Sequence, residues 1–260
     1  MRLKLLTAAI AGSVVAGGAL AADLSTYETR PVYVAPRPVW SWTGCRVGAN
    51  AGYGWQANRA YDPQYAASAG ADTADGFAGG GQVGCDYQLA GWVFGVQGML
   101  DGASIKGSHI YPPPDGDPGE TLGFNTSWFA TETARIGYLL MPQTLAYFRG
   151  GLAEAGIRYT DVDPSVSAIS PYWGSASATR VGWTIGGGAE YSFARNWSVF
   201  VEYDYMGFGS QNVTLSYTAP NPANAAPYTY RETQNLQTVL FGLNFKFDWA
   251  APPAPVAARY

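Results

Sequence analysis

Few residues of this sequence have the types and spacing that catalysis or metal binding requires. The sole histidine, His109, follows Ser108, so a base stands beside a nucleophile as in acyl-transfer enzymes. Neighbours along a chain do not by themselves form a hydrogen-bonded dyad, and no third, orienting group is evident. The acidic segment 115–120 offers carboxylates to calcium but lacks the ligand count of an EF-hand. We therefore expect no enzymatic activity and no cofactor.

The glycine-rich segment Gly79–Gly84 matches the sequence pattern of a dinucleotide-binding loop. Such a loop needs a strand before it and a helix after it, because the helix N-terminus holds the pyrophosphate. Here the segment lies inside an alternating pattern with no helix behind it. Its glycines are better explained as small residues that let a strand bend.

The elements that must position these residues follow from composition. Of 260 residues only 13% are charged and 15% are aromatic, and the net charge of -4 argues against a nucleic-acid partner. Residues 1–21 carry Arg2 and Lys4 before an apolar run that ends in small residues, which predicts a secretory signal peptide. The proline-containing segment 22–41 is expected to be an extended periplasmic linker.

From Trp42 onward the pattern repeats every second residue, which is typical of strands with one apolar face. Val181–Phe193 is a clear case, because its odd positions are apolar or small and its even positions are small or polar. Eight such segments can be counted. They cover about 43–56, 76–89, 92–104, 124–140, 145–159, 179–194, 197–212 and 233–249.

The connections between these segments alternate in length, which indicates the architecture. Short turns are expected at Ala90-Gly91, Pro142-Gln143 and Arg195-Asn196, and long loops at 57–75, 105–123, 160–178 and 213–232. A soluble β-sandwich has no reason to segregate its loops by length in this way. The pattern predicts an all-β fold, an eight-stranded antiparallel up-and-down transmembrane β-barrel over 42–249, with the long loops outside the cell.

Aromatic residues of the outward parity form two groups, as expected for two membrane interfaces. The larger group lies near the short turns and the thinner one near the long loops. The members are Tyr87, Trp92, Tyr138, Tyr191, Phe193, Trp197, Phe247 and Trp249, and then Trp55, Phe77, Trp128 and Tyr205.

Several motifs then resemble a known family, the small alphaproteobacterial outer-membrane proteins with an OmpA-like eight-stranded barrel. The resemblance covers nearly the whole chain after the signal peptide. It implies an abundant protein of the Gram-negative outer membrane that supports envelope integrity and surface contacts, with no catalytic residues. The motifs are Ser41–Gly44, Val47–Trp55, Gly79–Gly84, Trp92–Val96, Arg135–Tyr138, Val181–Thr184 and Val201–Tyr203.

This chain departs from that family at Cys45 and Cys85, where aromatic residues are usual. If Trp55 lies near Phe77, antiparallel pairing places Cys45 opposite Cys85 or Tyr87. Secretion brings the chain into an oxidising compartment, so we expect a cross-strand disulfide. The alternative is two independent small residues in the lipid belt.

The parity that sends aromatics outward sends a set of charged residues inward. An eight-stranded barrel leaves room for little more than side chains, so opposite charges are expected to pair and plug a lumen filled by hydrophilic residues. A narrow, low-conductance channel is the alternative. The expected lumen charges are Arg46, Asp86, Asp101, Arg135, Arg149, Glu190, Glu202, Asp204 and Lys246.

Glu132 and Glu154 instead have the lipid-facing parity, and pairing about Gln143 sets them opposite each other. We estimate their height at about 25 Å above the short turns, near the outer headgroups. A divalent-cation contact to lipopolysaccharide there is one interpretation, and two solvated rim carboxylates are the other.

The chain end leaves the barrel-assembly signal open. Either Phe247 and Trp249 form an internal signal before a proline-rich tail over 250–260, or Tyr260 serves. The expected partners are outer-membrane lipid and lipopolysaccharide, the barrel-assembly machinery, and extracellular ligands of the loops.

Overall fold

A computed structural model describes residues 40–110, 119–164, 172–218 and 227–247. These residues form eight antiparallel strands of 19 to 23 residues. Among them no helix is long and apolar enough to cross a bilayer. The strands are β1 (Gly44–Asp62), β2 (Ala67–Leu89), β3 (Trp92–Ile110), β4 (Thr121–Met141), β5 (Thr144–Asp163), β6 (Tyr172–Ala194), β7 (Trp197–Thr218) and β8 (Tyr228–Phe247).

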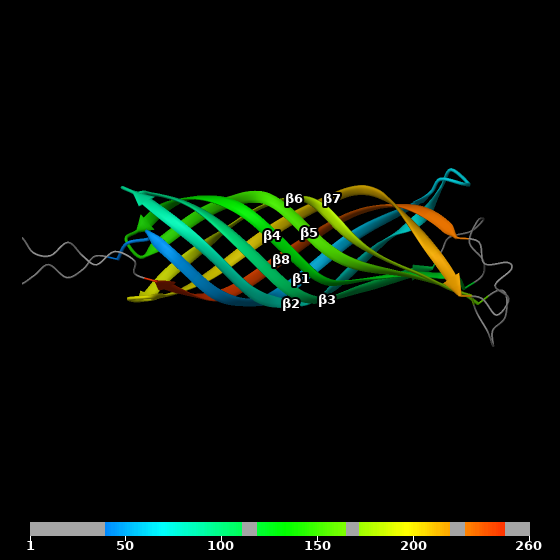
Figure 1. Cartoon of the computed structure of the whole chain (residues 1–260), viewed down its shortest axis with the longest axis horizontal. Helices are drawn as coiled ribbons and strands as arrows, with labels where there is room; N and C mark the ends of the chain where they lie inside the picture. The colour runs from blue at the N-terminus through cyan, green and yellow to red at the C-terminus, as the bar shows by residue number, and fades with distance from the viewer. Residues whose placement is uncertain (1–39, 111–118, 165–171, 219–226, 248–260) are drawn as a thin grey trace, which may run out of the picture. The chain divides into compact units, whose positions relative to one another are not determined.

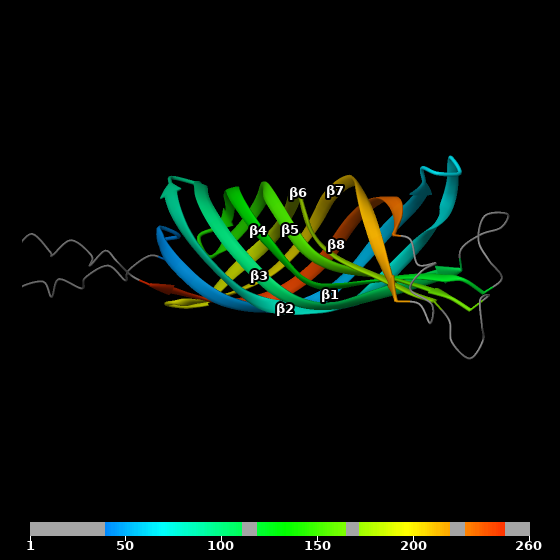
Figure 2. The same ribbon diagram turned by 45° about the vertical axis from the view of Figure 1, so that its right-hand side comes forward.

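Each strand pairs with its neighbour in sequence, and β8 pairs with β1, which closes the sheet into a barrel. The closing ladder runs from Cys45, opposite Phe247, to Tyr61, opposite Arg231. Figures 1 and 2 show the strands winding obliquely around the barrel axis. The eight-stranded up-and-down topology predicted from alternation and loop length is confirmed.

The two ends of the barrel differ in their connections. The tight turns after β2, β4 and β6 lie at one end, here called the short-turn end, together with the start of β1 and the end of β8. In the turn at Ala90-Gly91, the backbone of Ala90 has a left-handed conformation with a φ of 54°. The other end, the long-hairpin end, carries the connections between β1 and β2, β3 and β4, β5 and β6, and β7 and β8.

The strands extend further toward the long-hairpin end than the sequence predicted. The expected loop 57–75 is mostly strand, because β1 continues to Asp62 and β2 begins at Ala67. The expected loops 105–123, 160–178 and 213–232 are likewise shortened by strand at both sides. These extensions carry mostly polar or small residues on their outer face, with Tyr61, Ile110 and Trp173 as exposed exceptions, so the apolar alternation that marks the rest of each strand is weak there.

The outer wall toward the short-turn end is apolar. Exposed aromatics there include Tyr87, Trp92, Tyr138 and Phe193, each about half exposed. Trp55 and Phe77 are exposed further up, so the two aromatic groups occupy the outer surface as predicted. Trp249, the signal segment 1–21, most of the linker 22–41, the tail 250–260 and most of the acidic segment 115–120 lie outside the described residues.

Candidate functional site

The barrel lumen is the candidate site, because it holds buried charges that reach across the tube. Arg135 of β4 donates to both oxygens of Asp86 on β2, with Nε–Oδ1 of 2.7 Å and Nη2–Oδ2 of 2.6 Å. Its Nη1 contacts Glu190 of β6 at 3.0 Å. Arg46 of β1 also pairs with Asp86 and donates to Gln97 at 2.6 Å. One guanidinium thus links strands on both sides of β4.

A second ion-pair cluster lies beside the first. Arg149 of β5 binds Asp204 of β7 through two hydrogen bonds of 2.8 Å, and its Nη1 lies 2.9 Å from Glu202. Tyr147 donates its hydroxyl to Glu202 at 2.7 Å. The Arg135 guanidinium stacks over the Tyr147 ring at 4.9 Å. Tyr147 therefore joins the two clusters, which we together call the charge plug: Arg46, Asp86, Arg135, Arg149, Glu190, Glu202 and Asp204.

A chain of side-chain amides continues the network around the wall. Glu190 accepts hydrogen bonds from Ser198 at 2.6 Å and from Asn244 at 2.8 Å. Asn244 accepts from Gln82 at 2.8 Å, and Gln82 accepts from Asn50 at 2.9 Å. Because a carboxylate paired with an arginine only accepts, every amide in this chain must turn its NH₂ group toward Glu190. The lumen polar groups are thereby held in one orientation.

The chain segment before β1 covers the short-turn end of the lumen. Trp42 is 3% exposed and packs with Val93, Leu145 and Tyr147, which are all buried. Its indole N–H donates to the carbonyl of Pro142 at 3.2 Å. The backbone N–H of Trp42 also donates to Gln88, so the residue is held at both its ring and its backbone, in the same buried cluster as Tyr147.

The structure places eight of the nine expected lumen charges inside the barrel, buried to 8% exposure or less. Asp101 is fully buried, and among the described residues it has no ion pair within 4 Å. Lys246 differs, because it lies half-buried at the mouth. Its ammonium stacks over Trp40 at 4.6 Å and donates to backbone carbonyls of Ser41 and Thr43.

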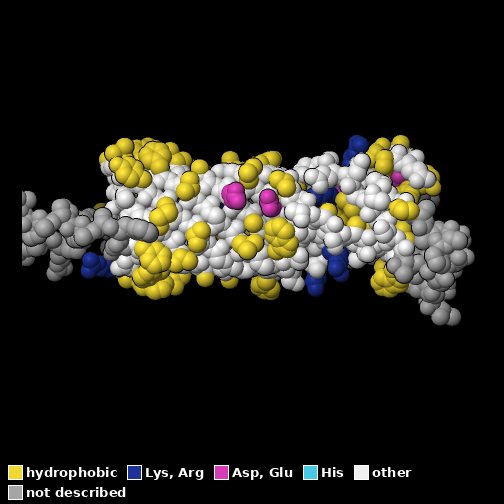
Figure 3. All heavy atoms as spheres, viewed as in Figure 1, with side chains coloured by type: hydrophobic (Ala, Val, Ile, Leu, Met, Phe, Trp, Pro, Cys, Tyr) yellow, Lys and Arg dark blue, Asp and Glu magenta, His cyan; other side chains and the backbone are white. Residues whose placement is uncertain are grey.

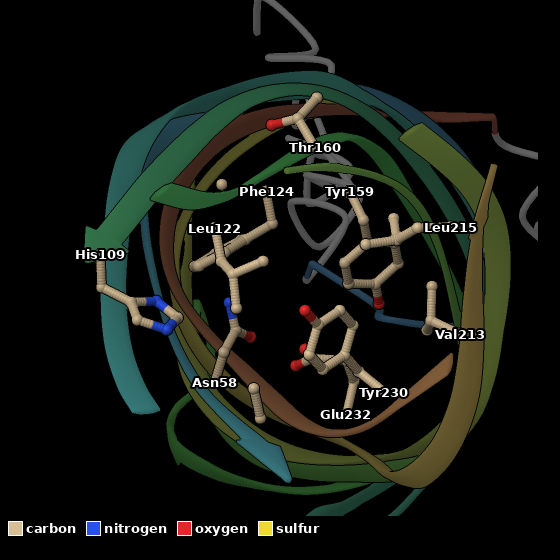
Figure 4. A pocket seen from close by; sticks show the side chains of 12 residues that line it. Asn58, His109, Leu122, Phe124, Tyr159, Thr160, Val213, Leu215, Tyr230 and Glu232 are labelled. Atoms are coloured by element: carbon tan, nitrogen blue, oxygen red, sulfur yellow. The ribbon is translucent and has the colours of Figure 1, made fainter. Parts of the chain in front are cut away.

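The expectation that hydrophilic residues fill the whole tube is wrong. From the level of Met99 and Leu240 to the long-hairpin end, the lumen holds a continuous set of buried hydrophobic residues, here called the apolar layer. Figure 4 shows several of these side chains pointing from the wall toward the barrel axis. The larger members are Met99, Ile105, Leu122, Phe124, Phe129, Ile157, Tyr159, Met206, Phe208, Val213, Leu215, Tyr230, Leu236 and Leu240.

Hydrogen bonds cross the lumen within the apolar layer as well. Thr126 of β4 donates to Gln56 of β1 at 2.6 Å, and Tyr159 of β5 donates to Gln234 of β8 at 2.8 Å. Each of these bonds joins strands three positions apart around the ring of eight, so the walls are in contact through their side chains. The layer leaves a cavity of about 20 Å³, lined by Phe124, Tyr159 and Tyr230 among others, which is room for about one water.

Four buried charged groups in the part of the lumen that holds the apolar layer were not among the predicted site residues: Asp62, Asp161, Arg180 and Glu232. Arg180 is fully buried and donates to the hydroxyl of Tyr159 at 3.0 Å and the backbone carbonyl of Glu232 at 3.4 Å. Glu232 lines the cavity, and burial raises the pKa of its carboxyl even though Arg180 acts against that. Arg180 has the same even parity as Glu190, so the alternation of the segment 179–194 could have identified it.

Comparison with known proteins decides the family. The sequence model of the family described as outer membrane protein beta-barrel domain matches residues 8–247 of this chain. The 31 kDa outer-membrane immunogenic protein of Brucella melitensis is 31% identical over 94% of this chain and 100% of its own length. The 25 kDa outer-membrane immunogenic protein of Brucella abortus is 29% identical over 84% of each chain.

The chain belongs to the outer-membrane protein β-barrel family. It is an outer-membrane protein, so the short-turn end faces the periplasm and the long-hairpin end faces the outside of the cell. Among solved structures it is similar to the outer membrane protease OmpT from Escherichia coli, at 10% identity and a TM-score of 0.49, covering 81% of this chain and 99% of that one. A likeness this low carries no argument about activity.

In this outer-membrane barrel the two cysteines stand directly opposite each other. Cys45 pairs with Cys85 in the β1–β2 register, and the structure joins their sulfurs in a disulfide near the periplasmic end. Of the two partners that the sequence left open, Tyr87 is not opposite Cys45. The reason is that Phe77 pairs with Tyr53 and Trp55 pairs with Asp75, which is two residues from Phe77.

Glu132 and Glu154 are both exposed on the outer face of the barrel. They are not opposite each other as expected. Glu132 pairs with Leu152 and Glu154 pairs with Ala130, because the turn is centred between Pro142 and Gln143 and an irregularity between Leu139 and Met141 shifts the β4–β5 register by one more residue. Among the described residues no group of three or more His, Cys, Asp or Glu could hold a metal ion.

Ser108 and His109 face opposite sides of the barrel wall. Ser108 is exposed, whereas the ring of His109 lies 2.9 Å from the carbonyl oxygen of Ala69 and 3.6 Å from Asp72. Consecutive residues of a strand point to opposite faces. The strand geometry thus separates the two groups that a hydrolytic dyad would need together.

Proposed function

We propose that this outer-membrane protein is a closed, non-enzymatic structural barrel, which contributes to envelope integrity and presents its long-hairpin end to the surroundings. The observation that carries this proposal is the bonding of opposite walls across the lumen. Arg135 reaches Asp86 on one side and Glu190 on the other, which supports a lumen obstructed by side chains at that level.

Three successive obstructions support a closed lumen. Trp42 covers the periplasmic mouth, the charge plug fills the next level, and the apolar layer fills the lumen above it. An ion crossing this path would have to break buried ion pairs and then enter an apolar region. Both steps are costly, because the desolvation of a charge is repaid only by well-placed partners.

Single-channel recording in planar bilayers tests the proposal. The refolded full-length protein is expected to give no stable conductance steps, because the three obstructions lie in series. A matched variant, Trp42→Ala, removes only the first of them and is also expected to stay closed. Reproducible steps from the wild-type protein would support the alternative of a narrow, low-conductance channel.

The structural role has a separate test in cells. Deletion of the gene is expected to increase the sensitivity of the bacterium to detergents, and re-expression of the wild-type protein should restore resistance. A closed barrel whose deletion leaves envelope resistance unchanged would contradict the structural role without contradicting closure.

A further inference from the structure

Four basic side chains point outward from the barrel wall at one height. They are Arg59 on β1, Lys106 on β3, Arg158 on β5 and Arg231 on β8, here called the basic girdle, and all four are exposed. Figure 3 shows the Lys and Arg side chains of the visible face gathered in one band toward the long-hairpin end, apart from a group at the opposite end. The other described cations point into the lumen or lie at the periplasmic end.

The strand register places two members of the girdle side by side. Lys106 pairs with Asn125 on β4, and Asn125 pairs with Arg158 on β5. Since neighbouring strands are about 4.8 Å apart, the backbones of Lys106 and Arg158 are about 10 Å apart. The same row continues to Ser177 on β6. Two cations thus flank a short amide, which leaves an open, polar surface between them.

The other two members lie on the neighbouring strands that close the barrel. Arg59 pairs with Thr233, two residues from Arg231 on β8. Arg231 donates to the amide oxygen of Asn212 at 3.5 Å. The girdle is therefore two pairs of cations on different sides of the wall, each pair facing sideways from the barrel.

The height of the girdle is set by the strands. Its members lie about 15 residues from the periplasmic strand ends, or about 40 Å at 3.3 Å per residue and a tilt near 40°. The apolar band of such barrels is about 25 Å tall. The exposed aromatics Trp55, Phe77 and Trp183 lie below the girdle along their strands. The girdle consequently stands just outside the hydrocarbon region, at the level of the outer-leaflet headgroups.

Acidic groups near the girdle form no close ion pair with it. Among the described residues, no carboxylate lies within 4 Å of any of its four cations. Asp75 stands opposite Lys106 across β2 and β3, and it accepts a hydrogen bond from Tyr53. Glu154 lies on the same strand and face as Arg158, four residues closer to the periplasm. The row from Lys106 to Arg158 keeps an excess of positive charge.

We propose that the basic girdle binds phosphate groups on the headgroups of outer-leaflet glycolipid, with Lys106 and Arg158 as the principal pair. Phosphate oxygens are strong acceptors for ammonium and guanidinium groups. The cations point sideways at the height of the headgroups, so they meet a molecule that stands beside the barrel rather than one that enters it. The inference rests on the outer-membrane placement and is independent of whether the lumen is closed.

Lipid binding by the folded, full-length protein in nanodiscs of neutral lipid tests the proposal. The titrants are bis-phosphorylated lipid A, the same lipid with both phosphates removed, and inorganic phosphate. The wild-type protein should bind bis-phosphorylated lipid A, and the double variant Lys106→Gln with Arg158→Gln should bind it about a hundredfold more weakly, or about tenfold for each cation that no longer donates to a phosphate. Added salt should weaken wild-type binding as well.

Two controls make the result specific. Arg195→Gln removes a cation from an exposed periplasmic turn and should leave binding unchanged, whereas Arg59→Gln with Arg231→Gln should give a smaller loss than the principal pair. Heat-modified gel mobility checks that each variant is folded. Equal binding of the dephosphorylated lipid, or undiminished binding by the Lys106 and Arg158 variant, would overturn the proposal. Inorganic phosphate binding as tightly as the lipid would replace it with a site for free anions.

Discussion

The two halves of this barrel wall have opposite polarity. Toward the periplasm, Phe148 faces outward at 74% exposure while its neighbour Arg149 is buried in the charge plug. Toward the outside of the cell, Arg158 faces outward while Ile157 and Tyr159 are buried in the apolar layer. The strand is the same, and only its surroundings change. Near the periplasm the lumen holds the polar groups of the charge plug, and from the level of Met99 and Leu240 upward it holds most of the buried hydrophobic side chains.

This inversion shows that the alternation of apolar and polar residues does not by itself identify which face of a strand points into the barrel. A strand that passes from lipid to water keeps its period of two but exchanges the character of its faces. The lower half is organised as a membrane barrel, and the upper half is packed like a water-soluble one. The two halves should therefore fail for different reasons when they are mutated.

The largest effect is expected from breaking the charge plug. Arg135→Met removes the shared partner of Asp86 and Glu190 and leaves buried carboxylates uncompensated, so the free energy of unfolding should fall by about 3–5 kcal/mol. Urea unfolding in detergent micelles, followed by tryptophan fluorescence, measures it. Arg195→Met makes the same change at an exposed turn and should cost far less. If both variants lose the same free energy of unfolding, the charge plug stabilises the fold no more than an exposed cation does.

A smaller loss is expected in the apolar layer. Leu240→Ala leaves a cavity in the lumen and should lower the free energy of unfolding by about 3 kcal/mol. Leu243→Ala, three residues on and 39% exposed to the membrane side, is the matched control. Lipid or detergent can fill the space that it leaves, so it should cost less. If Leu243→Ala proves the more costly variant, the upper lumen is not a packed core.

The disulfide between Cys45 and Cys85 ties β1 to β2 in the lower half. Thiol titration of the unreduced, denatured protein should find no free thiol. Reduction should then lower the free energy of unfolding by about 2–3 kcal/mol, since the bond constrains the unfolded chain. Two titratable thiols in the unreduced protein would contradict the pairing.

The smallest effect concerns pH and belongs to the upper half, outside the membrane. Burial raises the pKa of Asp161, although a hydrogen bond of 2.5 Å from Tyr217 opposes this. A raised pKa means that the folded state holds the proton more tightly than the unfolded chain. The contribution of Asp161 to stability is therefore present below its unfolded pKa of about 3.9 and lost as pH rises through its folded pKa.

Asp161→Asn should consequently become more stable relative to the wild type as pH rises above about 4. Tyr217→Phe removes the opposing hydrogen bond and should steepen the loss of stability with pH. Urea midpoints measured from pH 3.5 to 8 give both slopes. Parallel curves for all three proteins would rule out a proton on Asp161 as the cause.

The sequence predicted the fold closely and the lumen only in its lower half. Strand number, turn positions and closure follow from alternation at residues such as Val181–Phe193 and from the short turns, which are local signals. Upper strand segments such as Asp72–Asp75 lack an apolar outer face, so they were predicted as loop. The apolar layer does not stand out in the sequence because inward residues such as Met99 and Leu240 lie beside outward Leu100 and Phe241, so polarity does not alternate there.

The remaining differences between prediction and structure concern which residues of neighbouring strands pair with each other. The two-residue difference at Trp55 changes the partner of Cys45, and the turn centre together with the irregularity at Leu139 changes the partners of Glu132 and Glu154. Such shifts depend on how backbone hydrogen bonds settle across two strands, and no single strand's sequence carries that information. Trp42 was missed for a related reason, since its position depends on where the chain before β1 folds back.

The ladder between β1 and β8 joins the two ends of the chain, so the ring of hydrogen bonds is complete only after the last strand has arrived. The hairpin of β1 and β2 is local by comparison, with its cysteines only 40 residues apart. Long-range pairings form late because the intervening chain must first be ordered. During assembly β1 therefore carries an open hydrogen-bonding edge for most of the process. We expect that this edge has to be shielded until β8 replaces the missing partner.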